Sequence, residues 1–426
     1  MATSPELTSR DRRRTLLGAG LGWTFDGYET YALILTLGAA LPALLPAEDH
    51  ARIPFFAGAT IALTLFGFGV GGIVGGVLAD RYGRRRTLLW TVCAYAALTG
   101  MTALAWDWWA FALLRLLTGV ALGSEWSAGT TLVAETWPDR LRSRAAVLMQ
   151  SGVAVGFFVA AVMWFVLGPL SPAAWRWMFL IGIVPAVIAI VIRRRVPVSP
   201  VWAAEEDQAR TETLSGSRRV SRVRRMLADP GLRRITLVAG AMSLATTVGY
   251  WGVSTFVPQY FASVAAPAGW DAARATSVSG MVYTAGAVAG YLAVGFLAES
   301  WGRKPTVAVL FAGALVLTPI VFLWVHTVPV LLALLFVNGA FTLGQYGWMA
   351  IWLPELYPTS VRATGIALVF NASRLLACLG PLVAGSLIVA LGGFGATATT
   401  VGSVYLLGLA VVWLCPETRG QPLPQG

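Results

Sequence analysis

Two carboxylates inside one apolar segment are the residues best placed to do chemistry. Asp26 and Glu29 lie in the stretch Trp-Thr-Phe-Asp-Gly-Tyr-Glu-Thr, within an apolar segment that runs from about residue 16 to residue 45. A membrane-crossing helix needs about 20 apolar residues, and Asp26 would lie ~15 Å along such a helix, close to the bilayer midplane. Glu29 follows one turn later on the same face. Because ionisable groups are costly at this depth, the two acids predict a site that carries protons.

Three more charged side chains fall in apolar segments. Arg115 would lie at the same depth as Glu29, so the two can form an ion pair that either couples protons or only joins the first and fourth helices. Arg374 would lie near the midplane of the eleventh segment, and a guanidinium binds a carboxylate with two parallel hydrogen bonds. Arg374 therefore predicts an anion site, or alternatively a structural pair with Asp26 or Glu125. Glu125 itself, near the inner face, would either pass protons inward or support a loop.

Seven polar and aromatic residues of the apolar segments are candidates to line a substrate site. Together with the 57% hydrophobic composition they suit a ligand with an apolar or aromatic body, although each one alone could serve helix packing. They are Gln150, Tyr250, Trp251, Tyr283, Asn338, Tyr346 and Asn371.

The elements that must position these residues are membrane-spanning helices. Of 426 residues only 12% are charged, and the mean hydropathy of +0.70 excludes a soluble domain. Twelve apolar segments are predicted, at about 16–45, 56–79, 87–106, 109–135, 145–169, 175–192, 235–262, 273–298, 305–325, 328–354, 364–391 and 396–415. Nearly all of the 31 Lys and Arg residues fall in the loops on one side, which predicts an inner-membrane protein with both termini in the cytoplasm. The net charge of +11 therefore reflects sidedness and not nucleic-acid binding.

Two loop motifs recur about 220 residues apart, which indicates two equivalent halves. The stretch from Gly76 to Arg85 returns at 295–304, and the stretch from Glu135 to Arg142 returns at 355–362. We expect a first half at 1–192, a cytoplasmic linker at 193–234 and a second half at 235–426. The acids and arginines of these motifs are predicted to close the cytoplasmic side as a gate. They are Asp80, Arg84, Glu135 and Arg142 in the first half and Glu299, Arg303, Glu355 and Arg362 in the second.

These motifs resemble those of the major facilitator superfamily. The resemblance implies an all-α membrane protein with twelve transmembrane helices in two pseudo-symmetric six-helix halves. The closing stretch Pro-Glu-Thr-Arg-Gly at 416–420 is similar to the sugar-porter-like branch, but the predicted seventh helix lacks the paired glutamines of that branch. The stretch Asp-Gly-Tyr-Glu at 26–29 instead looks like the motif of proton-coupled aromatic-acid symporters. Asn371 to Arg374, followed by Gly-Pro, resembles the eleventh helix of organic-ion members.

These observations predict a proton-coupled symporter that imports a small organic anion, aromatic or another carboxylate, by alternating access. Arg374 and Arg115 would receive the substrate carboxylate, while Asp26 or Glu29 takes a proton. Proton-driven efflux of an apolar or aromatic compound and sugar import stay open, with a non-transporting membrane sensor as a remote alternative.

No enzyme is expected, because the sequence shows no nucleophile–base, metal or phosphate-loop spacing. The expected partners are the organic acid, protons and membrane lipid. No cofactor and no nucleic acid are expected, and the protein is predicted to be a monomer.

Overall fold

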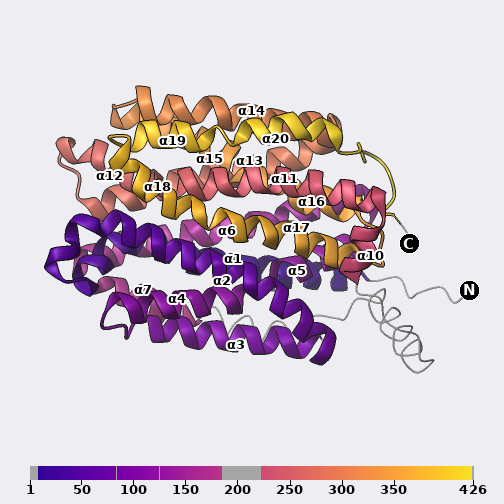
Figure 1. Cartoon of the computed structure of the whole chain (residues 1–426), viewed down its shortest axis with the longest axis horizontal. Helices are drawn as coiled ribbons and strands as arrows, with labels where there is room; N and C mark the ends of the chain where they lie inside the picture. Colours follow the sequence, from indigo (N-terminus) through magenta and orange to yellow (C-terminus); the bar gives the residue numbers. More distant parts are fainter. Residues whose placement is uncertain (1–7, 83, 124, 185–221, 425–426) are drawn as a thin grey trace, which may run out of the picture.

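The computed structural model describes residues 8–82, 84–123, 125–184 and 222–424 (Figure 1). Throughout this described part the secondary structure is helical, with no β-strand. Among the described residues, seven helical stretches are long and apolar enough to cross a membrane, and several of them join two shorter helices. The chain is an all-α membrane protein.

The described part of the first half holds seven α-helices. The predicted fourth span is divided into α4 and α5, and the sixth span begins with α7. The bounds are α1 (Ser9–Leu44), α2 (Ile53–Tyr82), α3 (Arg84–Thr102), α4 (Trp108–Leu122), α5 (Glu125–Thr136), α6 (Asp139–Leu167) and α7 (Ala174–Ile181), with short 3-10 turns η1 (Ala47–Arg52) and η2 (Gly168–Leu170).

The second half repeats this order with more interruptions. Its helices are α10 (Arg222–Ala228), α11 (Pro230–Val253), α12 (Val257–Ala265), α13 (Ala272–Ser300), α14 (Arg303–Pro319), α15 (Val328–Thr342), α16 (Gly347–Leu356), α17 (Arg362–Ala377), α18 (Leu379–Ala390), α19 (Phe394–Gly402) and α20 (Tyr405–Val411). Short turns join them at η3 (Ser254–Phe256), η4 (Ala266–Ala268), η5 (Ile320–Trp324), η6 (Gly344–Tyr346) and η7 (Val412–Leu414).

Helix α11 begins inside the stretch 193–234 that the composition predicts as linker. Asp229 accepts a hydrogen bond from the Leu232 backbone N–H, and Pro230 occupies the first helical position, where its missing N–H costs nothing. This capping pair starts the helix before the apolar run begins. Residues 193–221 of the predicted linker lie outside the described residues.

Several spans that hydropathy predicts as continuous are broken near their middle. In the seventh span the break at η3 lies just before Pro258, and in the eleventh the break at Cys378 lies just before Pro381. A proline ring clashes with the carbonyl four residues earlier, which here is Ser254 or Ala377. In the tenth span Gly344 opens the break η6, which holds Gln345 and Tyr346. These breaks place irregular backbone within three of the spans.

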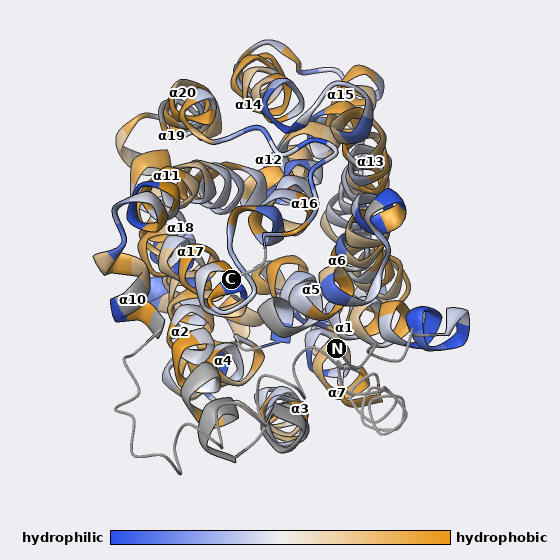
Figure 2. Cartoon of the chain, turned by 90° about the vertical axis from the view of Figure 1, so that its right-hand side faces the viewer, coloured by the Kyte–Doolittle hydropathy of each residue, from blue (hydrophilic) through white to orange (hydrophobic). Residues whose placement is uncertain are grey.

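The two halves meet along two seams. Helix α6 packs on α13 at one seam, and α2 packs on α17 and α18 at the other. In Figure 2 the first half fills the lower part of the bundle and the second half the upper part, with α6 beside α13 and α2 beside α17. Hydrophobic residues cover the helices all round the bundle, while strongly hydrophilic residues gather at the end that faces the viewer.

That end carries the motif loops and the C-terminal tail, and α1 begins there too (Figure 1). We call it the motif end.

Candidate functional site

The four residues of the α1 motif each have a different surrounding. Asp26 is buried. Gly27 packs directly on the backbone of Val153 in α6, where a Cβ would collide with a carbonyl oxygen. The Tyr28 hydroxyl donates to the Met178 carbonyl of α7 at 2.9 Å. Glu29 forms an ion pair with Arg115 of α4. One helical turn therefore fixes α1 against α4, α6 and α7.

The ion pair that the matching depths predict is present, and it lies within the first half. Besides Glu29, Arg115 donates hydrogen bonds to Thr102 and Thr118, and its guanidinium lies 4.8 Å from the ring centre of Phe179. Arg115 and Glu29 are 1% and 4% exposed, so this network is sealed from lipid. Every one of these contacts comes from the first half, so Arg115 is already compensated by the protein.

Arg374 has a different surrounding, made of aromatic rings. Its guanidinium lies 4.0 Å from the ring centre of Phe370, 4.7 Å from that of Phe68 and 5.9 Å from that of Trp23. Two of these rings belong to the first half, so Arg374 lies where the halves meet. The side chain is 5% exposed, and its Nε has no hydrogen-bond partner among the described residues. Asp26 lies within electrostatic reach of this guanidinium.

A stack of rings joins the halves beside Arg374. Trp126 of α5 stacks on Phe370 of α17 with ring centres 3.6 Å apart, and Trp23 is tilted against both. The Trp126 indole N–H donates to the Gln150 side-chain oxygen at 2.7 Å. The sequence reading missed these three aromatic residues. Their spacing was the available signal, because Trp23 and Phe370 lie about one helical turn from Asp26 and Arg374.

The remaining predicted lining residues are buried in the second half and at its border. Tyr346 lies in η6, with its ring 5.7 Å from that of Tyr250. Asn338 is buried in α15. The Asn371 side-chain amide donates to its own helix at Ala367, and its Oδ1 has no partner among the described residues. Asn371 also fills the space left by Gly72 of α2, so it packs the second seam.

Glu125 is the first described residue of α5 and is 6% exposed. Its roles in proton transfer and in loop support stay predictions.

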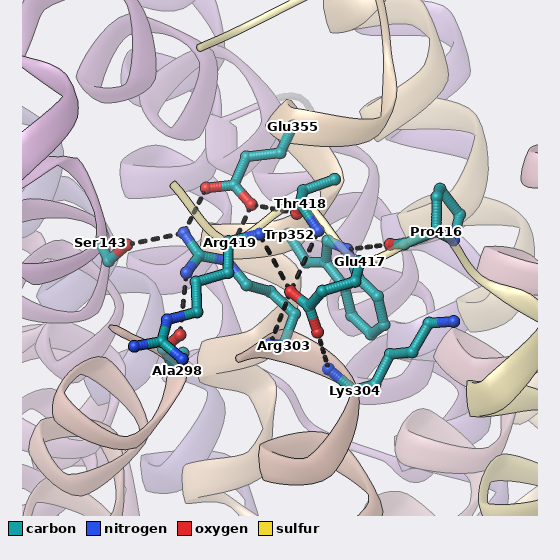
Figure 3. Close-up of polar contacts among 10 residues, drawn as sticks. All are labelled: Ser143, Ala298, Arg303, Lys304, Trp352, Glu355, Pro416, Glu417, Thr418 and Arg419. Atoms are coloured by element: carbon teal, nitrogen blue, oxygen red, sulfur yellow. Dashed lines mark hydrogen bonds and ion pairs between the residues drawn. The ribbon is translucent and has the colours of Figure 1, made fainter. Parts of the chain in front are cut away.

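The motif end holds a buried charge network (Figure 3). Arg303 donates two hydrogen bonds to the Glu355 carboxylate, at 2.7 and 3.0 Å, and a third to Ser143 of the first half at 3.3 Å. Glu355 also accepts a 2.6 Å hydrogen bond from Thr418 in the tail. A bidentate pair of this kind is much stronger than an exposed one.

Two ion pairs cross from one half to the other at this end. Arg362 lies 3.5 Å from Glu135, and Arg144 lies 3.2 Å from Glu299. The predicted gate residues include Arg142 but not Arg144. Arg142 is nevertheless buried, and it interacts electrostatically with Glu355, Arg303 and Arg362 of the second half.

Two further predicted gate residues, Asp80 and Arg84, have side chains outside the described part of the structure.

The C-terminal tail is part of the same network, which the sequence reading also missed. The Glu417 carboxylate accepts backbone hydrogen bonds at the start of α14 and within the tail, from the N–H groups of Arg303, Lys304, Thr418 and Arg419. Burial acts to raise the pKa of Glu417, but these donors outweigh it and hold that pKa below its ordinary value. Further along, the Pro424 carbonyl accepts from Arg362 at 2.9 Å. The tail thus ties α14 to the gate.

Comparison with known proteins identifies the family. The model of the family described as "Sugar (and other) transporter" matches residues 47–425. The chain is 30% identical over 416 residues to a Haemophilus influenzae protein whose name assigns it to metabolite transport, covering 96% of this chain and 97% of that one. It is 28% identical to the cis,cis-muconate transport protein of Acinetobacter baylyi, covering 82% and 83% of the two chains. It is 29% identical to the 3-(3-hydroxyphenyl)propionate transporter of Escherichia coli, covering 83% of each.

The fold agrees with this assignment. The proton:xylose symporter XylE, solved with bound 6-bromo-6-deoxy-D-glucose, superposes with a TM-score of 0.77 at 20% identity, over 98% of each chain. XylE is a protein of the major facilitator superfamily, whose fold has twelve transmembrane helices in two six-helix halves. The sequence prediction of the fold class is therefore confirmed, as is the prediction that the chain is a transporter and not an enzyme. The chain belongs to the sugar (and other) transporter family, and it has the fold of the major facilitator superfamily.

Proposed function

We propose that this protein imports a small organic anion together with protons by alternating access. The observation that carries the proposal is the surrounding of Arg374. The Arg374 guanidinium is buried between the halves, lies against aromatic rings, and has an Nε without a hydrogen-bond partner among the described residues. It keeps donor capacity that a substrate carboxylate can use, with Asp26 as the protein acid within electrostatic reach. The rings beside it suit the apolar or aromatic body of such an anion.

Asp26 and Glu29 supply the proton coupling in this scheme, with Glu125 as a candidate relay toward the motif end. Asp26 lies within electrostatic reach of Arg374, so an anion bound at Arg374 would act on the same pair of charges. When the first half rearranges, Glu29 leaves its ion pair with Arg115 and takes up a proton. Arg115 would then become free to assist the anion, as the sequence predicts. The motif end faces the cytoplasm of the inner membrane, in line with its basic loops.

Two similar proteins support an anionic cargo. The relatives from Acinetobacter baylyi and Escherichia coli are named for muconate and hydroxyphenylpropionate, which are both carboxylates. Sugar import is the competing cargo class within the family. A neutral sugar cannot form the charge-assisted pair that a carboxylate forms with the Arg374 guanidinium, which disfavours it.

Uptake by the purified protein in proteoliposomes tests the proposal. Labelled benzoate, hydroxybenzoates, muconate and xylose are supplied with and without an inward proton gradient. We expect gradient-driven uptake of a carboxylate and none of xylose.

Arg374→Gln should lower carboxylate uptake at least tenfold, since charge-assisted hydrogen bonds contribute about 1.5–3 kcal/mol. Arg52→Gln, an exposed arginine in η1, serves as the matched control. Xylose uptake, or carboxylate uptake unaffected by Arg374→Gln, would refute the anion site. Asp26→Asn with Glu29→Gln should abolish accumulation but keep exchange; accumulation that persists would refute the proton role.

A further inference from the structure

Five buried tyrosines gather around the centre of the molecule. We call Tyr31, Tyr250, Tyr283, Tyr291 and Tyr346 the tyrosine cluster. They come from α1, α11, α13 and η6, so the cluster spans both halves. The Tyr250 ring lies 5.7 Å from that of Tyr346, and Tyr250 is within electrostatic reach of the other four phenols.

The first half supplies an apolar wall to this cluster. Tyr31 stacks on Phe157 of α6, with ring centres 4.6 Å apart and planes only 5° from parallel. Phe157 in turn lies 6.5 Å from the Tyr250 ring. A flat ring is the shape that fits against such carbon faces.

The second half supplies a polar wall. Tyr346 is within electrostatic reach of both Arg374 and Tyr283. The Tyr283 hydroxyl shares a 2.7 Å hydrogen bond with Thr342, which lies one helical turn beyond Asn338. Polar groups therefore continue from the anion site along η6, α13 and α15.

Two hydroxyls of the tyrosine cluster differ in their hydrogen bonding from three tyrosine hydroxyls elsewhere in the chain. Tyr28, Tyr260 and Tyr357 all donate to protein oxygens at 2.9–3.2 Å. The hydroxyls of Tyr291 and Tyr346 instead have no partner in hydrogen-bond geometry among the described residues, although Gln150 approaches the first and Thr247 and Trp251 approach the second.

The Asn338 side-chain nitrogen is likewise without a partner in the described part of the chain. These three side chains are at most 5% exposed. Leaving such a buried group unpaired costs about 1–3 kcal/mol, so a partner from outside the protein is favoured.

We propose that the tyrosine cluster and Asn338 form a second recognition pole that selects ring carboxylates bearing a hydroxyl group over the unsubstituted acids. This inference rests on the proposed function, because the carboxylate at Arg374 sets the orientation of the ring. With the carboxylate at Arg374 and the ring against Phe157, a ring hydroxyl faces Tyr346 and Asn338. An acid without that hydroxyl leaves the buried groups unpaired, and polar sites of this kind discriminate far more strongly than apolar ones.

Competition in proteoliposomes tests the second pole. Benzoate, 3-hydroxybenzoate, 4-hydroxybenzoate and cyclohexanecarboxylate compete against uptake of one labelled member of this set. The wild type should prefer at least one hydroxybenzoate over benzoate by tenfold or more. Tyr346→Phe and Asn338→Leu should each reduce that ratio at least threefold, and thermal unfolding in detergent checks that both variants fold. Tyr291→Phe is a second, milder variant, and Tyr260→Phe is the control, since that hydroxyl donates to backbone carbonyls outside the cluster.

The outcomes separate the two proposals. Equal affinity of the wild type for benzoate and both hydroxybenzoates, or a preference unchanged in all three cluster variants, overturns the second pole. If uptake of these acids still depends on Arg374, the proposed function survives that result. If none of these ring acids is transported while muconate uptake still depends on Arg374, the second pole fails and the proposed function survives; if no carboxylate is transported, both fail.

Discussion

At the scale of single residues, two buried arginines carry the functional argument. Arg115 is bound by a carboxylate, two threonine hydroxyls and a ring, whereas the contacts described for Arg374 are to rings. A buried guanidinium that is already paired with a protein carboxylate and hydroxyls gains little binding energy from an anionic ligand. One held by carbon faces gains strongly when an anion arrives. The structure therefore favours Arg374 over Arg115 as the first contact of the substrate.

The Arg115–Glu29 pair can be tested through stability. We expect Arg115→Leu to lower the free energy of unfolding by about 3–5 kcal/mol, because it leaves the Glu29 carboxylate buried without its partner. Adding Glu29→Met should recover most of that loss. Thermal unfolding in detergent measures both. Arg52→Leu, which breaks the exposed pair with Asp49, should cost about 1 kcal/mol or less. A double variant no more stable than Arg115→Leu would show that the pair is not the source of the loss.

Depth along a helix is the residue-scale property that the sequence predicts well. The fixed rise per residue placed Glu29 and Arg115 at one level, and their ion pair is present. The surroundings of Arg374 could not be predicted in the same way. Its rings come from α1, α2 and α17, and which of them it meets depends on how the two halves dock. Arg144 was missed for the same reason, since its partner Glu299 lies in the other half.

At the scale of elements, hydropathy predicts where spans lie but not where they break. The helix ends extend past the apolar segments because polar caps such as Asp229 start the helix earlier. The breaks need local chemistry, and Pro258 and Pro381 were readable signals for two of them. The break at η6 has no proline, so its position depends on packing that a single sequence does not reveal.

Close helix packing gives the element-scale prediction. A Cβ on Gly286 of α13 would collide with the Phe336 carbonyl of α15, whereas a Cβ on Gly240 of α11 would meet nothing within 4 Å. We expect Gly286→Ala to lower stability by about 1–3 kcal/mol, because the helices must move apart. Gly240→Ala should leave stability unchanged or raise it by up to about 1 kcal/mol, through helix propensity. Thermal unfolding of the two variants compares them directly, and equal melting temperatures would contradict the packing argument.

At the scale of the whole molecule, the two halves contact each other near both ends by different means. At the motif end the contacts are ion pairs, Arg362 with Glu135 and Arg144 with Glu299. At the opposite end they are close backbone packing, such as Gly58 against Pro381. Ion pairs can be broken singly by substitution, while the packing of a backbone cannot. Substitutions at the motif end can therefore test what sets the equilibrium between its closed and open conformations.

Removing one of these pairs should open the motif end. Glu135→Gln deletes the charge that meets Arg362, and a loss of roughly 1 kcal/mol changes the ratio of closed to open molecules about fivefold. Spin labels at the exposed positions Leu141 of α6 and Trp301, just after α13, report the separation of the halves by pulsed electron resonance. We expect a longer-distance population that grows several-fold in Glu135→Gln and stays at the wild-type level in Arg224→Gln, which removes an exposed charge on α10. A distance distribution unchanged by Glu135→Gln would mean that the pair does not hold this end closed, and that the Arg303–Glu355 network with its docked tail does so without it.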